Sequence, residues 1–413
     1  MVTPGALSGI RVLDLSRVFS GPWAGQMLAD FGADVIKVER PVKGDETRVQ
    51  GFRLRDADGR ASGETSSFIS MNRGKRSVTL DIAAPEGQAL ARRLAAQCDV
   101  LLENFKAGDL ARYGLDWATL SKDHPRLVYC SISGFGQTGP YSHQPGYDPI
   151  FQGMSGLMSI TGIADGEPGA GPMKVGYAVS DITTGFYAVI AILAALRHRD
   201  VMAARGEDGG QHIDLAMLDA QIAAMSPSAM NYLVSGKLQP RMGTGSMITC
   251  PYQAFECADG HIMIAVGNDA QFRNYCNALE LPALPDDARF ATTPQRARNQ
   301  KALVPLLAEA MKRRGVSEWR AMLDKVNVPC GPIYDFQQAF DDPQVRHREV
   351  LRSMPFSGPA EIPMIANPIR FSATPVRYDR PPPLLGEHTR EVFGELLGLG
   401  DAEVDALAGR KIV

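Results

Sequence analysis

One aspartate of this chain stands where a carboxylate could act as a nucleophile. Asp181 lies in Gly176-Tyr-Ala-Val-Ser-Asp-Ile-Thr-Thr-Gly185, directly before the apolar stretch Ile182–Leu196, which predicts a helix. Asp is a preferred N-cap residue, worth about 1 kcal/mol of helix stability, and the helix dipole keeps a carboxylate at this end ionised. We therefore predict that Asp181 caps the helix, and that it could also serve as an exposed nucleophile among glycines.

The sequence contains no motif of a serine-hydrolase or metal-dependent catalytic centre. The sequence has no Gly-x-Ser-x-Gly elbow. None of its seven histidines stands in a His-Glu-x-x-His motif or at paired metal-ligand spacing, so we expect structural histidines and no metal. The chemistry is then left to carboxylates, backbone amides and the substrate itself.

A glycine-rich motif, Gly134-Phe-Gly-Gln-Thr-Gly139, has the spacing of a dinucleotide-binding loop. Such a loop must open a helix whose N-terminus faces the pyrophosphate. Pro140 and Pro145 follow instead and predict a loop, and the acidic residue expected about 20 residues further on is missing. We therefore expect no NAD.

Basic residues gather near two predicted strands. Asn72-Arg-Gly-Lys75-Arg76 opens one strand, Arg40 ends another, and Arg112 lies downstream. Solvated charges are the usual explanation of such a run. At the crevice of a doubly wound sheet, however, Arg and Lys would bind a ligand that carries several phosphates. We favour this second interpretation.

The elements that position these residues alternate in the first half of the chain. Pro85 opens a helix with Leu90 and Leu94 on one face, and another helix-like stretch ends at Asp30. The alternation predicts βαβ units and an α/β fold with a parallel sheet, whose ligands bind at the carboxyl ends of the strands. The expected strands are Ile10–Leu15, Asp34–Glu39, Arg76–Ile82, Asp99–Glu103 and Leu127–Ser133.

From about residue 200 the pattern changes. Residues 201–211 predict a polar turn, 212–235 a helix, and Ala258-Asp-Gly-His261 a hairpin within Tyr252–Val266. The stretch 340–413 could belong to either lobe, and one last helical segment lies in it. The other expected helices of a smaller lobe are 270–280, 300–313 and 316–326.

Length and composition exclude several classes of protein. A chain of 413 residues exceeds one hydrophobic core, and a net charge of −3 lacks the footprint of a nucleic-acid binder. The six cysteines have no CxxC spacing and the N-terminus shows no secretory signal. We therefore expect free thiols and a cytoplasmic protein, or a mitochondrial-matrix one in a eukaryote. Phe186–Leu196 is shorter than the roughly 20 residues that cross a bilayer, so we expect a buried helix and no membrane.

Motif after motif, from about Leu7 to the C-terminal tail, the sequence resembles the class III (CaiB/BaiF-type) CoA-transferases. SISGFGQTGP, SGLMSITG, VPCGPIYDF and RPPPLLGEHT are similar to members that act on succinyl-CoA and glutarate. The other motifs are, in order, Leu13-Asp-Leu-Ser-Arg-Val-Phe-Ser-Gly-Pro22, Gly32-Ala-Asp-Val-Ile-Lys-Val-Glu-Arg-Pro41, Asn72-Arg-Gly-Lys-Arg-Ser77, Glu103-Asn-Phe105, Gly134-Phe-Gly-Gln-Thr-Gly-Pro140, Gly146-Tyr-Asp148, Ser180-Asp181 and Pro251-Tyr-Gln-Ala-Phe255.

The resemblance implies an interlocked homodimer, in which each chain threads through a hole in its partner. It implies a Rossmann-like, CoA-binding large domain in 1–200, a linker in 201–224 and a smaller α+β domain in 225–335. Residues 336–413 would be a linker and a C-terminal return to the large domain.

The resemblance also implies roles for single residues. Asp181 matches the family's nucleophile, and Gly243-Thr-Gly245-Ser246 matches a mobile glycine loop that we expect to cover it. Arg48, Lys174 and Arg241 are candidate cations for the distal carboxylate of a dicarboxylic acid. Contacts with coenzyme A are implied for Phe19, Ser20, Arg40, Arg73, Lys75, Asn104, Phe105, Arg112, Gly134, Phe135 and Gly136.

The implied reaction moves CoA from an acyl-CoA, expected to be succinyl-CoA, to a short dicarboxylic acid such as glutarate. It would pass through aspartyl anhydride and aspartyl-CoA thioester intermediates. A 2-methylacyl-CoA racemase of the same fold is the alternative. Related racemases use a His/Asp pair, and Tyr147 stands at the His position here; tyrosine is a poor base at neutral pH. Formyl-transferring members carry Gln where this chain has Phe19, which argues against a formyl donor.

Overall fold

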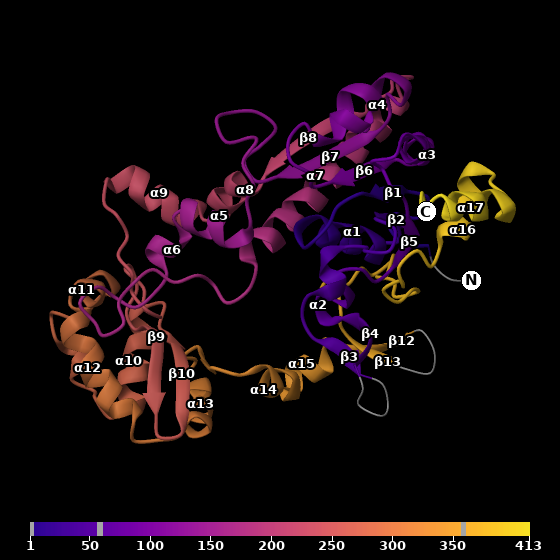
Figure 1. The fold of residues 1–413 in the computed structure, drawn as a ribbon. Helices are drawn as coiled ribbons and strands as arrows, with labels where there is room; N and C mark the ends of the chain where they lie inside the picture. The colour runs from indigo at the N-terminus through magenta and orange to yellow at the C-terminus, as the bar shows by residue number, and fades with distance from the viewer. Residues whose placement is uncertain (1–3, 56–60, 357–360) are drawn as a thin grey trace. The chain divides into compact units, whose positions relative to one another are not determined.

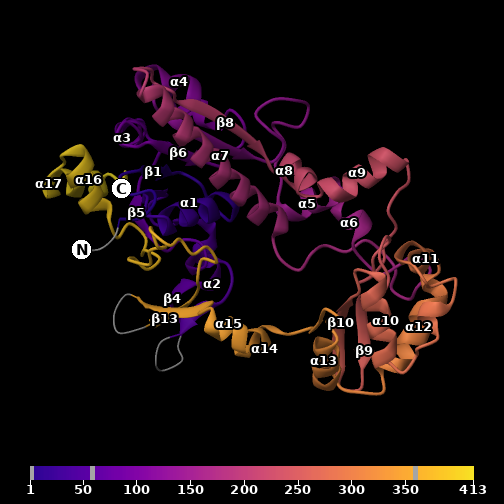
Figure 2. The ribbon, with the colours of Figure 1, turned by 180° about the vertical axis from the view of Figure 1, so that it is seen from behind.

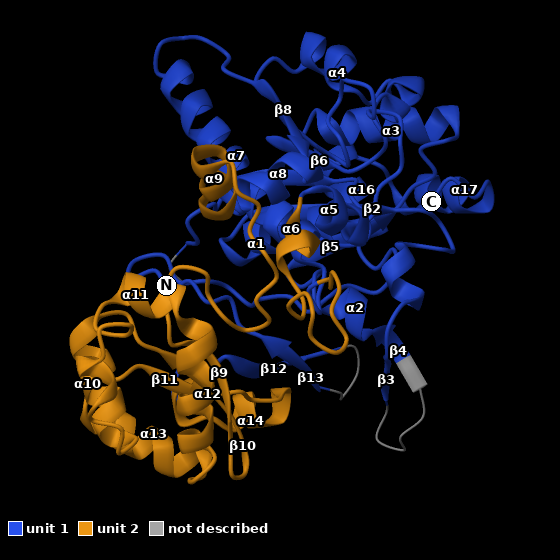
Figure 3. Ribbon diagram, turned by 90° about the vertical axis from the view of Figure 1, so that its left-hand side faces the viewer, with its two compact units in different colours: residues 1–155, 175–226, 346–413 blue, residues 156–174, 227–345 orange. Residues whose placement is uncertain are grey.

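The computed structural model describes residues 4–55, 61–356 and 361–413, and the chain forms two compact units (Figure 3). The larger unit consists of Met1–Ser155, Val175–Ser226 and Arg346–Val413; the smaller one consists of Gly156–Lys174 and Pro227–Val345. These bounds differ from the expected domains. Residues 201–224, expected as a linker, and 225–226 belong to the larger unit, whereas 156–174 and 336–345 belong to the smaller one.

The larger unit is built on a six-stranded sheet in the order β5-β2-β1-β6-β7-β8 (Figures 1 and 2). Every neighbouring pair is parallel, which confirms the predicted α/β class with a parallel sheet. The strand order reverses between β1 and β6, so a ligand crevice is expected at the carboxyl ends of these two strands. The strands are β1 (Arg11–Asp14), β2 (Asp34–Glu39), β5 (Lys75–Thr79), β6 (Val100–Glu103), β7 (Val128–Ser133) and β8 (Gln211–Ala216).

Helices cover both faces of this sheet because successive residues of its strands point to opposite sides. Val12 and Val35 lie in the core with α1 (Ser20–Asp30) and α7 (Val179–Ala203). Leu13 lies in the opposite core, and C-terminal helices return to that face beside β5 (Figure 1). The helices of this second face are α3 (Pro85–Ala95), α4 (Trp117–Asp123), α16 (Thr389–Leu397) and α17 (Asp401–Gly409).

Shorter elements complete the larger unit. A single C-terminal helical segment was predicted, and two are present, because Gly398 ends α16 in a left-handed conformation before α17 starts. The remaining elements are η1 (Glu46–Val49), β3 (Arg53–Arg55), β4 (Ala61–Thr65), α2 (Ser66–Ile69), η2 (Asp109–Tyr113), α5 (Asp148–Met154), α8 (Met217–Ala224), β12 (Leu351–Pro355) and β13 (Glu361–Ile365).

The predicted helix over 212–235 is wrong at its beginning. Residues 212–216 lie in β8, which pairs with β7 and completes the sheet. Ile213 and Leu215 alternate with polar residues and pack on the core, which is the pattern of a strand. The helical part starts at Met217 and breaks at Met225, between α8 and α9 (Ser226–Ser235).

Helix α7 is longer than the apolar run predicted, and only one side of it is buried. Ala188 and Ile192 lie in the core under the sheet, whereas Phe186 and Ile190 are exposed. Among the described residues, α7 alone is long and apolar enough to cross a membrane by those two measures. The buried side of α7 packs against the sheet, and core helices of globular proteins pass the same test of length and composition.

The smaller unit has its own core around an antiparallel sheet in the order β11-β10-β9. The predicted hairpin is confirmed, with Gly260 opposite Cys257 at its turn. The elements are α6 (Leu157–Ile160), α9, β9 (Tyr252–Cys257), β10 (Gly260–Ala265), α10 (Asp269–Ala278), η3 (Leu284–Asp286), α11 (Thr293–Arg298), α12 (Gln300–Met311), α13 (Val316–Lys325), β11 (Cys330–Pro332) and α14 (Phe336–Asp341); α15 (Pro343–His347) leads back to the larger unit.

Candidate active site

A cavity of about 210 Å³ lies at the carboxyl ends of β1, β2, β5 and β6, where the strand order reverses. Its walls are partly apolar, and two arginines line it. Apolar walls suit a flat heterocycle, and guanidinium groups suit phosphates. Residues of this wall include Leu15, Arg17, Arg40, Ile82, Phe105 and Tyr113.

Arg40 and Phe105, both predicted to contact CoA, come together at this cavity from the ends of β2 and β6. Arg17 is a third wall residue that sequence reasoning missed. Its guanidinium carbon lies 5.0 Å from the Phe105 ring centroid, and its Nη1 lies 2.6 Å from Glu46 Oε1. Its position directly after β1, inside the motif Leu13–Pro22, is the signal that could have identified it.

Three other predicted cations lie in buried ion pairs instead. Arg73 donates to both carboxylate oxygens of Asp30, at 2.8 and 2.7 Å. Lys75 donates to Asp14 at 2.9 Å, and Arg48 holds Glu39 through two bonds of 2.7 Å. Removing either partner of such a pair would leave an unpaired buried charge. These side chains therefore stabilise the fold.

Asn104 and Arg112, also predicted to contact CoA, have protein partners. The Asn104 side chain accepts from the Arg17 N–H at 2.8 Å and donates to the Arg17 carbonyl at 2.6 Å. Arg112 is exposed on η2 and pairs with Asp109 at 3.0 Å. Asn104 therefore fixes the backbone of the loop after β1, next to the cavity that Arg17 borders.

Asp181 does not cap α7, contrary to the prediction. Helix α7 begins two residues earlier, and Ala178 is its N-cap residue. The capping acceptor comes from elsewhere: Asp148 Oδ1 accepts from the N–H of Ser180 at 2.7 Å and of Asp181 at 3.4 Å. The Asp181 carboxylate is thereby left free of the capping role and available for chemistry.

The surroundings of Asp181 raise its pKa to about 7, chiefly through burial and then through the negative charge of Asp148. Hydrogen bonds from the backbone and side chain of Ser20 act in the opposite direction and lower the pKa. The helix dipole alone was expected to keep this carboxylate ionised, and burial overrides it. Asp181 is therefore divided between its two protonation states near neutral pH.

Ser20 reaches Asp181 because α1 and α7 approach closely at Gly185. A Cβ atom at Gly185 would lie 2.9 Å from the Ser20 carbonyl oxygen and 2.8 Å from Trp23 Cδ1. Only glycine fits at this distance. Phe19, the other residue predicted here, is the N-cap of α1.

The segment Gly134-Phe-Gly-Gln-Thr-Gly139 forms a loop after β7, as predicted, and Gly136 has a φ of 90°. Phe135 packs edge-on against Phe151, with ring centroids 5.3 Å apart. Phe151 lies on α5, the helix that begins at Asp148. The loop thus buttresses the helix that supplies the cap of α7.

The remaining predicted residues divide between the units. Tyr147 is 70% exposed and directly precedes Asp148. Lys174, Arg241, Gly243 and Gly245 belong to the smaller unit, so their expected roles stay predictions. The Arg241 guanidinium pairs with Asp165, and the Gly243 N–H donates to the Gly162 carbonyl at 3.0 Å.

The structure thus has a cavity bordered by Arg17 and Arg40 at the point where the strand order reverses, and a partly buried carboxylate whose pKa is raised to about 7. The family model described as CoA-transferase family III matches residues 7–389. The chain therefore belongs to this family and is a CoA-transferase, which confirms the prediction from its motifs.

Two similar proteins and one similar solved structure cover nearly the whole chain. A succinate–glutarate CoA-transferase of Agrobacterium fabrum is 47% identical over 393 residues, which cover 94% of this chain and 95% of that protein. The succinyl-CoA:glutarate CoA-transferase of Homo sapiens is 37% identical over 407 residues, covering 98% and 90% respectively. The crystal structure of a CaiB/BaiF family protein from Brucella suis matches with a TM-score of 0.83 at 43% identity, covering 95% of this chain and 100% of that one.

Proposed function

We propose that this protein transfers CoA from succinyl-CoA to glutarate or a closely related dicarboxylic acid. The observation that carries a covalent transfer is the Asp181 carboxylate, which is partly buried at the start of α7 and accepts hydrogen bonds from Ser20. The names of the relatives in Agrobacterium fabrum and Homo sapiens support this donor and acceptor.

The chemistry would proceed as a covalent relay on Asp181. The ionised carboxylate attacks the succinyl thioester carbon and releases the CoA thiolate, which leaves a mixed anhydride. The thiolate then attacks the aspartyl carbonyl carbon, succinate departs, and an aspartyl-CoA thioester remains. Glutarate displaces the thiolate to give a second anhydride, whose glutaryl carbon the thiolate attacks, releasing glutaryl-CoA and free Asp181. Partial burial serves this sequence because water would hydrolyse each intermediate.

The crevice at the switch point would hold the nucleotide end of CoA. Its apolar wall around Phe105 would pack on the adenine, and Arg17 and Arg40 would face phosphate groups. The carboxyl end of β1 then leads through Phe19 and Ser20 to Asp181. One loop therefore connects the CoA crevice with the nucleophile.

We also propose that the chain forms the interlocked homodimer that its family resemblance implies. Exposed apolar side chains support an assembly, since large apolar residues in water mark interaction surfaces. They include Phe186 and Ile190 on α7, Ile222 on α8, and Met230 and Leu233 on α9.

The direct test is mass-resolved exchange between CoA esters. Purified protein and succinyl-CoA are incubated separately with glutarate, adipate, itaconate, 3-hydroxy-3-methylglutarate, oxalate and carnitine, with Asp181→Ala as control. We expect glutaryl-CoA with the wild type alone. The racemase alternative predicts instead no exchange with any acid, together with solvent deuterium entering the α-carbon of a 2-methylacyl-CoA.

A further inference from the structure

The loop between β1 and α1 contains a strained residue. Val18 has a φ of 70°, in the left-handed region. That region is costly for a β-branched side chain, and such a residue persists there only where its surroundings hold it. Val18 lies two residues before Ser20, which donates hydrogen bonds to the Asp181 carboxylate. The strain therefore lies in the connection between the CoA crevice and the nucleophile.

Two side chains from the loops after β2 and β6 hold the backbone at this point. The Val18 N–H donates to Asp45 Oδ1 at 3.3 Å. On the preceding residue, the Asn104 side chain accepts a hydrogen bond from the Arg17 N–H at 2.8 Å and donates one to the Arg17 carbonyl at 2.6 Å. The peptide groups on the N-terminal side of Val18 are thus fixed by side chains distant in the sequence.

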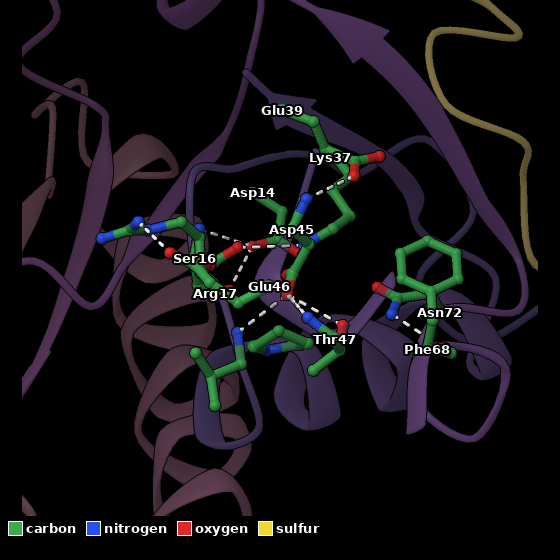
Figure 4. Close-up of polar contacts among 12 residues, drawn as sticks. Asp14, Ser16, Arg17, Lys37, Glu39, Asp45, Glu46, Thr47, Phe68 and Asn72 are labelled. Carbon is green, nitrogen blue, oxygen red and sulfur yellow. Dashed lines mark hydrogen bonds and ion pairs between the residues drawn. The ribbon is translucent and has the colours of Figure 1, made fainter. Parts of the chain in front are cut away.

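Asp45 is itself held rigidly. Its carboxylate forms a fully buried ion pair with Lys37 at 2.8 Å and accepts from the N–H and hydroxyl of Thr47 at 2.9 and 2.8 Å (Figure 4). The same Lys37 ammonium donates to the Ser16 carbonyl at 3.0 Å. One ion pair therefore fixes the loop on both sides of Arg17.

We propose that Asp45, with Lys37, and Asn104 are positioning residues for the transfer reaction. They hold Val18 in its left-handed conformation and so direct the N–H and hydroxyl of Ser20 at the Asp181 carboxylate. The inference rests on the proposed function, because these residues would favour the ionised form of the proposed nucleophile Asp181 and orient its carboxylate. None of them needs to touch the reacting atoms.

The test is a double-mutant cycle with Val18→Gly, because glycine adopts the left-handed conformation without help. Asn104→Ala and Asp45→Ala are made in the wild-type and in the Val18→Gly background, and kcat is measured against pH at saturating succinyl-CoA. In the wild-type background we expect kcat to fall by roughly tenfold to a hundredfold. The midpoint of the acid limb should also move to higher pH, towards that of Ser20→Ala, as Asp181 loses the hydrogen bonds that favour its ionised form. In the Val18→Gly background both changes should be smaller.

Asp45→Ala leaves Lys37 unpaired and can unfold the protein, so the Asn104→Ala cycle carries the test if that variant is lost. Asp30→Ala is the matched control: it breaks the buried pair with Arg73 at the other end of α1. It should lower the melting temperature and leave the midpoint in place. Equal losses of kcat in both backgrounds, or an unmoved midpoint in Asn104→Ala, would overturn the proposal. Failure of the proposed function is distinct, because the wild type would then transfer no CoA.

Discussion

Burial and two neighbouring residues, Asp148 and Ser20, set the pKa of Asp181, and they do not act in the same direction. Burial and the carboxylate of Asp148 raise its pKa to about 7, and the hydrogen bonds from Ser20 lower it. A carboxylate must be ionised to act as a nucleophile. Burial, which keeps water away from the reaction, favours the protonated form instead. Asp148 acts only to raise this pKa: the same carboxylate that caps α7 repels the negative charge on Asp181.

The balance predicts a pH profile and how Asp148→Asn changes it. In the wild type kcat should rise with pH through about 7, because the proposed mechanism requires ionised Asp181 and the folded-state pKa of Asp181 is raised to that value. Asn keeps an oxygen that can accept from the Ser180 N–H but removes the negative charge, so the midpoint should move to lower pH. Steady-state kcat for glutaryl-CoA formation across the neutral range measures it. Asp286→Asn, an exposed carboxylate of the smaller unit, serves as control. A midpoint unchanged by Asp148→Asn would show that Asp148 does not set this ionisation.

At the level of elements, the close approach of α1 and α7 brings Ser20 and Asp181 together. Gly185 permits it, since a Cβ atom there would lie 2.9 Å from the Ser20 carbonyl oxygen. Ordinary helix propensity would favour alanine over glycine at this position by about 1 kcal/mol. Gly185 therefore lowers the local stability of α7 but allows α1 and α7 to approach each other closely.

Gly185→Ala should accordingly separate the two helices at the nucleophile. We expect kcat to fall by about tenfold or more, because Ser20 is displaced from Asp181, together with a lower melting temperature. Gly409→Ala on α17 is the control, since a Cβ there meets no atom within 4 Å and should be neutral or stabilising. Wild-type activity in Gly185→Ala would contradict the proposed role of this helix contact.

Sequence patterns predicted most of these elements, and the failures have physical reasons. Buried strands such as β2 and β6 stand out as short apolar runs, whereas the alternation of Ile213 and Leu215 merges with the helix that follows β8. The carboxylate that caps α7 comes from Asp148, 32 residues before Ser180, so no local pattern indicates it. Likewise, the sequence alone suggests that Lys75 is an unpaired cation, because its partner Asp14 is 61 residues away.

For the whole molecule, the sheet places the cavity proposed to bind CoA where its strand order reverses, and apolar side chains of α7, α8 and α9 are exposed in a single chain. Burying such surface against a second copy would stabilise the assembly. The C-terminal helices return to the larger unit through α15.

The proposed homodimer predicts a mass in solution twice the 44.7 kDa of one chain. Because interlocked chains cannot separate without unfolding, the mass should not fall on dilution. Light scattering and analytical ultracentrifugation over a wide range of concentration measure it. A monomer, or a dimer that dissociates readily on dilution, would exclude an interlocked assembly.

The central claim, that Asp181 carries the acyl group covalently, predicts the fate of the oxygen atoms. The protein is first loaded with succinyl-CoA, then given glutarate whose carboxylates carry heavy oxygen, and the peptide containing Asp181 is analysed by mass spectrometry. When the thiolate attacks the glutaryl carbon of the second anhydride, the bridging oxygen stays with the aspartate. Heavy oxygen is therefore expected in the Asp181 carboxylate after one turnover. Production of glutaryl-CoA with no label in that peptide would contradict this expectation.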